Sequence, residues 1–437
     1  MFAGVCRAEP GQKADLKLLQ AQVRKLRAEV QSLRQAKQRE ATEASAPDAQ
    51  TEPSAAQAVL RDADRQSRLM DFSGMSAGWN ENRGFFIRSD DGKFVLSPFV
   101  LFQARYATSI RQEARPDGGS DTQSGFEIRR LQFGLDGNVF TPDLTYRIFW
   151  QSSELTSGNL SLLMAWVQYR FHDTPWVIGG GQFKDPLDHE QLISDALQMA
   201  NDRTFVDDIL AGGEAFSKGV DLRYDDGGAV RGEAAFTSGF NANNSTFQQF
   251  PTNAANFGLA ARGEYKLLGK WKDYEHFTSW GNSGDVLVIG AGADWTEAGH
   301  TDAVRHVVDV QYNPGPLGLY ASYLGRYTAG NKAGAGGDTY DPSVRLQASY
   351  LFNRHWEGFA RYDYVHFDGK EFKTAQNTSV NEFTIGANCY LRGQAAKITC
   401  DVSYLPNGTP TTDLGNDVLA NANHGEVVVR AQFKLML

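Results

Sequence analysis

The 437-residue chain has a net charge of −9 and only three cysteines, so it has neither the basic excess of a nucleic-acid-binding protein nor a disulfide framework. It contains no run of about 18 apolar residues, which excludes a transmembrane helix. Its 44 glycines and 12% aromatic residues are typical of a large all-β protein with many strands and turns.

The first twelve residues, MFAGVCRAEPGQ, lack the apolar core of about 7–15 residues that a signal peptide contains. We therefore expect residues 1–12 to be a leader remnant or disordered. A lipid anchor at Cys6 is the alternative, although the preceding residues lack the expected small residue just before the cysteine.

Residues 13–40 have the spacing of an α-helical coiled coil. Apolar residues recur every three or four positions, at Leu16, Leu19, Val23, Leu26, Val30 and Leu33. The alternative is a single amphipathic helix lying on another surface. Residues 41–83 follow as a flexible linker, rich in Ala, Ser and Pro in its first part.

From residue 84 to residue 437 the pattern has a period of two and predicts 16 strands. They are 94–106, 125–140, 144–153, 160–171, 176–187, 218–225, 229–239, 256–268, 285–297, 303–313, 317–328, 344–353, 356–367, 381–392, 396–405 and 425–437. Many are longer than the roughly 5–6 residues of soluble strands, and about 9–11 tilted residues cross a bilayer. We therefore predict an all-β fold, a 16-stranded antiparallel transmembrane β-barrel with an N-terminal coiled-coil segment.

The connections between these strands alternate between short and long, as the periplasmic turns and outer loops of outer-membrane barrels do. The long ones are 107–124, 188–217, 240–255, 329–343, 368–380 and 406–424. Two connections break this alternation. The connection 269–284 is long where a short turn is expected, and the connection 298–302 is short where a long loop is expected. The even strand count predicts both termini, and with them the coiled coil, on the periplasmic side of a bacterial outer membrane.

Three segments resemble the phosphate-selective porin O and P family: GKFVLSPFVLFQARY (92–106), GFEIRRLQFGLDGNVFTPDLTYRIFW (125–150) and GGGQFKDPLDHEQLISDALQMANDRTF (179–205). The first two are similar to its first three strands, and the third to a strand that runs into the loop folded into the pore. The resemblance implies a homotrimer of anion-selective barrels whose pores carry arginine ladders and a lysine cluster. We therefore expect the loop at 188–217 to fold into the lumen and narrow it.

Alternation along each strand assigns basic side chains to the lumen, because a charge on the lipid face at mid-bilayer costs about 2–4 kcal/mol. The predicted pore-lining, ion-binding residues are Arg130, Arg147, Arg170, Lys184, Arg223, Arg231, Arg262, Arg305, Arg345 and Arg361. One interpretation is an arginine ladder for anions. The other is ordinary lumen polarity, with each arginine paired to a carboxylate such as Asp309 or Asp363.

The loop at 188–217 departs from a simple anion filter because its charges are mostly acidic. Its predicted constriction residues are Asp188, His189, Glu190, Asp195, Asp202, Arg203, Asp207 and Asp208. This excess of carboxylates argues against a phosphate-specific filter, although small anions, phosphate included, remain candidate solutes.

No motif for catalysis, phosphate-binding loop or metal site is present, so we expect no enzyme activity, cofactor or metal. Two functions remain. The first is a water-filled channel for passive diffusion of small ions and solutes; the second is a structural tether whose coiled coil links the lipid bilayer to the cell wall.

Cys389 and Cys400 are predicted to be neighbours on the lipid face of one hairpin. A two-residue turn at Gln394 and Ala395 would place them directly opposite each other. A disulfide between them and simple side-by-side packing are equally compatible with this pattern.

Overall fold

A computed structural model describes residues 74–80, 84–112, 121–153, 157–213, 215–240, 255–297, 302–329, 337–368, 378–408, 416–418 and 424–437. They belong to one compact unit, Ser73–Leu437. The predicted leader remnant at 1–12, the coiled coil at 13–40 and most of the linker at 41–83 lie outside the described residues. Among the described residues, no helix is both long and apolar enough to cross a membrane.

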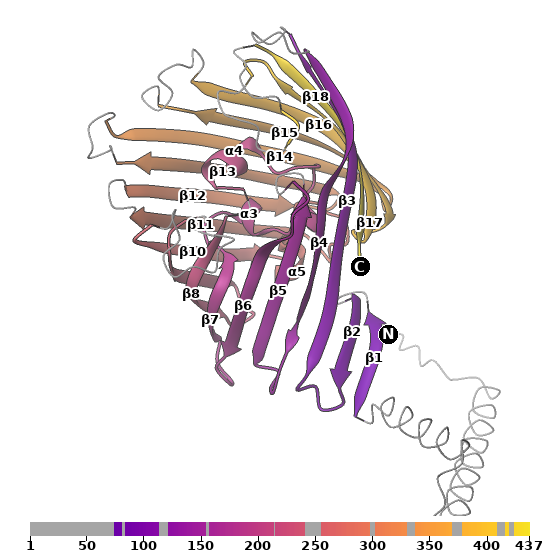
Figure 1. Cartoon of the computed structure of the whole chain (residues 1–437), viewed down its shortest axis with the longest axis vertical. Coiled ribbons are helices and arrows are strands. Elements are labelled where there is room, and N and C mark those ends of the chain that lie inside the picture. Colours follow the sequence, from indigo (N-terminus) through magenta and orange to yellow (C-terminus); the bar gives the residue numbers. More distant parts are fainter. Residues whose placement is uncertain are drawn as a thin grey trace, which may run out of the picture. The chain divides into compact units, whose positions relative to one another are not determined.

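Sixteen antiparallel strands form a closed barrel (Figure 1). Each strand pairs with the next, and β18 pairs with β3 through partners such as Val429 and Thr108, which closes the sheet. The strands are β3 Val95–Arg111, β4 Thr122–Asn138, β5 Leu144–Ser153, β6 Ser161–Arg170, β7 Trp176–Lys184, β8 Phe216–Asp225, β9 Val230–Thr237, β10 Phe257–Leu268, β11 Val286–Glu297, β12 Asp302–Asn313, β13 Leu317–Thr328, β14 Thr339–Asn353, β15 Trp356–His366, β16 Ser379–Arg392, β17 Ala396–Leu405 and β18 Glu426–Met436. The predicted fold class and strand number are confirmed.

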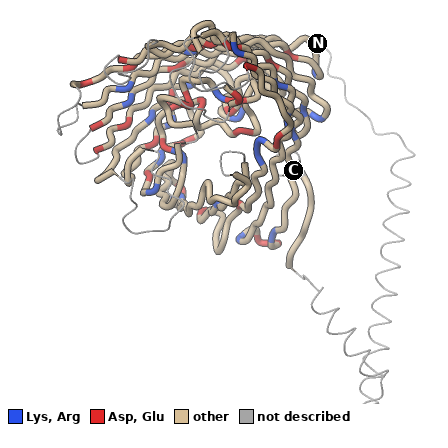
Figure 2. The backbone as a smooth tube through the Cα atoms, turned by 45° about the horizontal axis from the view of Figure 1, so that its top comes forward, with Lys and Arg blue, Asp and Glu red and all other residues tan. Residues whose placement is uncertain are grey.

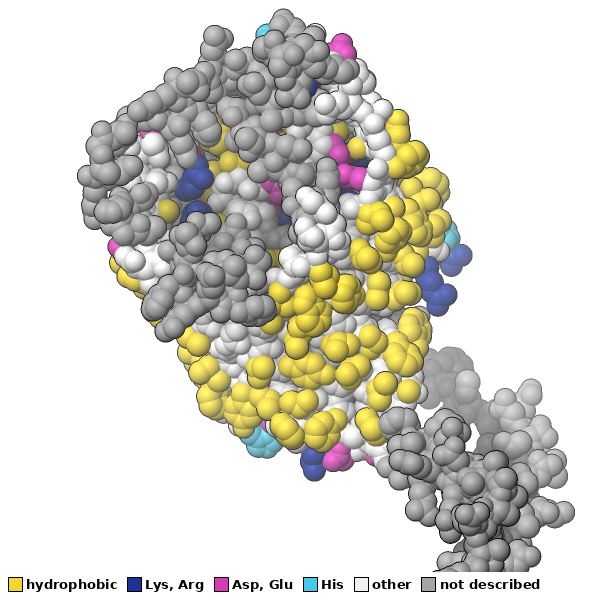
Figure 3. All heavy atoms as spheres, in the orientation of Figure 1, with side chains coloured by type: hydrophobic (Ala, Val, Ile, Leu, Met, Phe, Trp, Pro, Cys, Tyr) yellow, Lys and Arg dark blue, Asp and Glu magenta, His cyan; other side chains and the backbone are white. Residues whose placement is uncertain are grey.

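Side chains alternate across the barrel wall because successive residues of a strand point to opposite faces. Along β11, Ile289 and Trp295 are exposed on the outside, whereas Val288 and Asp294 are buried on the inside. Figure 3 shows the result, a broad band of hydrophobic side chains around the visible outer face. Such a band matches the apolar belt of a barrel surrounded by lipid.

A short hairpin precedes the barrel and was not predicted. It consists of β1 Met75–Asn80 and β2 Gly84–Ser89, and β2 pairs with the start of β3 through Ile87 and Arg88. Met75–Asn80 falls within the predicted linker at 41–83, so strand structure is present before residue 84. Six residues with an internal glycine are too few for period-two alternation to stand out from a linker.

Cys389 and Cys400 lie on the outer face, as predicted, but the predicted register is wrong. Cys389 pairs with Ile398, and Cys400 pairs with Ala387, so the two thiols are diagonal neighbours. The turn between Arg392 and Ala396 contains three residues instead of two, and the register shifts again between Tyr390 and Arg392. Both cysteines are free.

The connections differ in length at the two ends of the barrel. At one end, the short-turn end, they span only a few residues, for example 139–143, 226–229 and 393–395. From the opposite, long-loop end, the connection 185–215 folds into the lumen with three short helices, α3 His189–Leu192, η1 Asp195–Leu197 and α4 Phe205–Leu210 (Figure 1). The connection 269–285, with α5 Trp271–Tyr274, folds in from the short-turn end.

Candidate functional site

The constriction loop, residues 185–215, is closed at its neck and packed against the inner wall. The Asp185 amide donates to the Ala215 carbonyl over 3.0 Å, which joins the two ends of the loop. Gly292 of β11 faces this neck, and a side chain there would collide with the Leu187 carbonyl. Thr204 caps α4 by accepting a hydrogen bond from the Asp207 amide.

An apolar patch on the inner wall explains why α4 sits where it does. Val206 and Leu210 of α4 are fully buried against inward-facing side chains of the wall. Those wall residues are Val307, Leu324, Val365, Val380, Leu405 and Val428. Val428 interrupts the polar face of β18 in the sequence, and its contact with the loop accounts for that interruption. Burying these groups stabilises the loop in the lumen, because an apolar wall in contact with water costs free energy.

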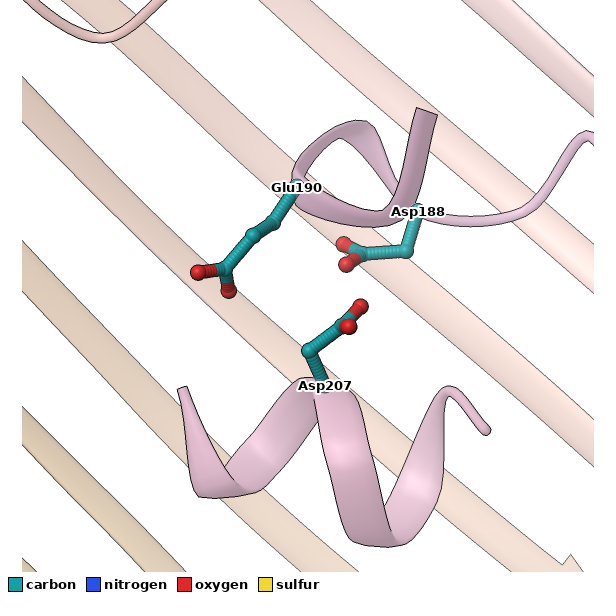
Figure 4. A group of neighbouring side chains, drawn as sticks. All are labelled: Asp188, Glu190 and Asp207. Atoms are coloured by element: carbon teal, nitrogen blue, oxygen red, sulfur yellow. The ribbon is translucent and has the colours of Figure 1, made fainter. Parts of the chain in front are cut away.

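Three carboxylates of the loop, from Asp188, Glu190 and Asp207, lie close together (Figure 4). Arg345 of β14 binds two of them, with N–O distances of 2.5 Å to Asp188 and 3.0 Å to Glu190. The guanidinium of Arg203 lies 3.6 Å from Asp207. Burial raises the pKa of Asp207 well above its usual value. Each of the three carboxylates therefore has an arginine as a neighbour, Arg345 for Asp188 and Glu190 and Arg203 for Asp207.

Four arginine side chains surround the carboxylate of Asp202 in the loop. Three guanidiniums, from Arg105, Arg129 and Arg430, contact its carboxylate at 2.5, 3.0 and 3.3 Å, and Arg130 follows at 3.7 Å. Burial alone would raise the pKa of Asp202, but these cations hold it well below its usual value. Four wall arginines are thus neutralised in part by one loop carboxylate, which stays ionised.

Arg130 was among the residues predicted to face the lumen, whereas Arg129 and Arg105 were not. The register of β3 and β4 shifts between Gln103 and Ala104, because Gln103 pairs with Arg130 and Ala104 with Ile128. Arg129 is the extra residue of this bulge and turns inward beside its neighbour. A bulge leaves no period-two signal, so Arg129 could not be assigned; Arg105, in contrast, follows the regular alternation of β3.

Six of the ten predicted pore-lining cations contact the constriction loop rather than open water. Lys184 donates to the carbonyls of Gln191 and Ile193. Arg262, Arg305 and Arg361 donate to the carbonyls of Leu187, Leu210 and Asp202. The other two, Arg130 and Arg345, bind the loop carboxylates described above. These side chains face the lumen, but the loop covers them.

The other four, Arg147, Arg170, Arg223 and Arg231, lie on β5, β6, β8 and β9 and have partners on the wall, and Arg231 also lies 4.3 Å from the ring centroid of Trp271 in the connection 269–285. Arg147 is 40% exposed and sits 3.8 Å from Asp136. Arg223 contacts Glu233 at 3.2 Å, and Arg231 contacts Asp225 at 3.0 Å. The exposed Arg170 donates to the Asp225 carbonyl near the short-turn end.

A polar cavity of about 260 Å³ lies between this wall and the loop. Leu192 lines it on the loop side. The wall contributes both signs of charge, from Arg223, Arg231, Arg262, Glu233 and Glu264. Figure 2 shows the same mixture of acidic and basic positions around the lumen.

The remaining predicted constriction residues have different surroundings. Asp195 binds Arg203 at 2.6 Å and accepts a hydrogen bond from Gln132. His189 is buried and its ring stacks on Tyr274, and burial lowers the pKa of His189. Asp208 accepts a hydrogen bond from Asn416, and burial, with Asp202 nearby, raises the pKa of Asp208 to about 7.

The barrel is similar in fold to solved structures of bacterial porins and channels. It is similar to an anion-selective porin from Comamonas acidovorans, with 13% identity, a TM-score of 0.54, and coverage of 78% of this chain and 99% of that chain. It is also similar to OprB from Pseudomonas putida, with 8% identity, a TM-score of 0.54, and coverage of 78% of this chain and 94% of that chain. The outer membrane channel DcaP of Acinetobacter baumannii gives 12% identity, a TM-score of 0.51, and coverage of 80% and 99%. At these identities the likeness shows the fold.

No curated protein sequence matches the chain. The family described as Phosphate-selective porin O and P matches residues 102–435, which is nearly the whole barrel. With the closed 16-stranded barrel and its inserted loop, this match assigns the chain to the bacterial outer membrane as a channel-forming protein. The chain belongs to the phosphate-selective porin O and P family.

Proposed function

We propose that the barrel is a diffusion channel for small ions and hydrophilic solutes with a modest preference for anions. The observation that carries this proposal is the partial exposure of Arg147, Arg223 and Arg231 on the wall of β5 to β9, whose side chains are 40, 32 and 30% exposed. The loop covers most of the inner wall elsewhere, and we propose that water and solutes pass along this side. Guanidinium groups at a narrow passage attract anions because the low-dielectric wall focuses their field.

The preference is modest because each of these arginines has a carboxylate neighbour. Asp136, Glu233 and Asp225 lie within 4 Å of Arg147, Arg223 and Arg231, respectively. The strongest concentration of guanidiniums surrounds Asp202, and that carboxylate occupies the point where a phosphate would otherwise bind. We therefore propose a general anion preference without a tight phosphate site.

Recordings in planar bilayers test this proposal. The parent protein in a KCl gradient should give a reversal potential displaced toward that of chloride. A triple variant, Arg147→Gln with Arg223→Gln and Arg231→Gln, should shift the reversal potential toward that of potassium. Arg326→Gln is the matched control, because Arg326 pairs with Asp341 on a different wall, and it should leave selectivity unchanged.

Two results would contradict the proposal. One is a triple variant with the selectivity of the parent. The other is a block of the chloride current by micromolar phosphate, which would reveal a tight phosphate site.

A further inference from the structure

The connection between β10 and β11, residues 269–285, is long for the end of the barrel from which it starts. Its side chains turn into the lumen: Trp271, Tyr274, Phe277 and Thr278 are all at most 6% exposed. We call this segment the short-turn insert. A diffusion channel does not require an inserted segment at this end. The role of the short-turn insert is therefore inferred from the residues that it contacts.

The short-turn insert is fixed to the barrel wall along its length. The Trp271 indole donates to the Gly228 carbonyl over 2.9 Å. Further along, Gln311 donates to the His276 carbonyl and Asn313 to the Thr278 carbonyl, at 2.7 and 3.1 Å. These three hydrogen bonds hold the insert against the wall. They are needed because α5, with four residues, is its only helix among the described residues.

The short-turn insert also contacts the constriction loop, on the side of the loop that faces the short-turn end. The His189 ring of α3 lies parallel to the Tyr274 ring, with centroids 3.8 Å apart and planes at 6°. Phe277 meets His189 edge-on at 5.5 Å. Phe277 also packs with Ile193 and Met199 of the loop in one apolar cluster.

Gln311 of β12 joins the two segments through hydrogen bonds. Its side-chain oxygen lies 2.9 Å from Nε2 of His189, and its side-chain nitrogen donates to the insert at His276. The four residues of α3 form too short a helix to be stable alone. Its position therefore depends on what lies against it.

We infer that the short-turn insert positions the first half of the constriction loop, with Tyr274 and Phe277 as its positioning residues, and so keeps the passage at one width. The inference rests on the proposed path, because Leu192 at the end of α3 lines the cavity beside the wall arginines. The ion pairs at Asp202 hold the second half of the loop. The insert supplies the matching support for the first half.

Single-channel recordings test the inference first. Tyr274→Ala and Phe277→Ala should each raise the rate of transient closures roughly three- to tenfold, the effect expected for loss of one aromatic contact. Tyr274→Phe keeps the stacked ring and loses only the hydroxyl contacts with Arg262 and Glu264, so its channels should close less often than those of Tyr274→Ala. Lys272→Ala changes an exposed side chain of the same insert and serves as the matched control.

Thiol accessibility tests the same inference without relying on current. In a background with all three native cysteines replaced, Met199→Cys places a thiol at a position that is 1% exposed beneath Phe277. A charged thiol reagent should leave it unmodified in the folded parent and modify it when Tyr274→Ala or Phe277→Ala is added. Folding of each barrel is checked by its mobility in unheated gels.

The inference would be overturned if both alanine variants closed at the rate of the parent and kept the thiol at position 199 unmodified. If the thiol becomes reactive while the triple arginine variant keeps the parent selectivity, the insert still positions the loop and only the proposed path is wrong. The two proposals therefore fail on different measurements.

Discussion

At the residue scale, the most consequential side chain is the carboxylate of Asp202. It compensates guanidiniums from three strands, β3, β4 and β18, that would otherwise repel one another inside the barrel. Removing one partner of a buried ion pair costs about 3–5 kcal/mol because the other charge remains buried without compensation.

Asp202→Asn should therefore release the second half of the loop and leave its arginines facing water. We expect a higher single-channel conductance, a stronger anion preference, and a lower temperature of heat-induced unfolding in gels. Asp91→Asn is the control, because Asp91 lies in the turn between β2 and β3, outside the constriction loop and the wall of β5 to β9, and its pair with Lys93 is more than half exposed and so contributes little to stability. Unchanged selectivity in Asp202→Asn would show that the arginines do not sense the permeating ions.

We predict that Asp208 makes the channel dependent on pH. Its pKa is raised to about 7 by burial and by the charge of Asp202. A raised carboxyl pKa stabilises the fold fully below the ordinary value of 3.8, and that contribution disappears as the pH rises through about 7. The second half of the loop should thus be held more firmly at pH 5 than at pH 8.

The measurement is the reversal potential in a salt gradient between pH 5 and pH 8. Neutral Asp208 removes a negative charge from the lumen, so anion preference should increase as the pH falls, with a midpoint near 7. Asp208→Asn should weaken this transition. A transition of the same size in that variant would assign it to another group.

At the scale of elements, the constriction loop determines the width of the channel. Deleting roughly residues 200–210 removes Asp202 and all of α4, together with its apolar contacts with the inner wall. Single-channel conductance should rise severalfold. A conductance equal to that of the parent would mean that the loop does not limit the flow of ions.

The predicted coiled coil at 13–40 is a second element with a testable role. We propose that three such helices associate in the periplasm and contribute to a homotrimer, since tethering to the barrels raises their effective concentration. Replacing Leu19, Leu26 and Leu33 with Asp should lower the temperature at which the trimer dissociates in detergent. An equally resistant trimer would mean that the barrel walls hold it alone and that the helix has another partner.

The strands could be predicted from the sequence because the membrane imposes alternation over about ten residues at a time, as β11 and β17 show. The face of Cys400 followed from that alternation, but its partner did not, because one unpaired residue near a turn shifts the whole register. The covering of Arg345 and Arg361 could not be predicted either. It depends on the path of a loop that is distant in sequence, and only the interruption at Val428 hinted at that contact.

At the scale of the whole molecule, the barrel has two different inner walls. Most of the wall from β10 through β18 and on to β3 and β4 is covered by the loop and the short-turn insert. The wall of β5 to β9 keeps Arg147 and Arg223 partly exposed to water, whereas Arg231 also packs against Trp271 of the short-turn insert, 4.3 Å from its ring centroid. The central claim is that solutes pass along this second wall.

Thiol modification during single-channel recording tests this claim most directly. In a background without native cysteines, Arg223→Cys places a thiol on the open wall, and Gln347→Cys places one on β14, where the side chain is 5% exposed. A bulky charged reagent should sharply reduce the conductance of Arg223→Cys channels and leave Gln347→Cys channels unchanged. A block at position 347 with no effect at position 223 would contradict the account, because it would place the path behind the loop.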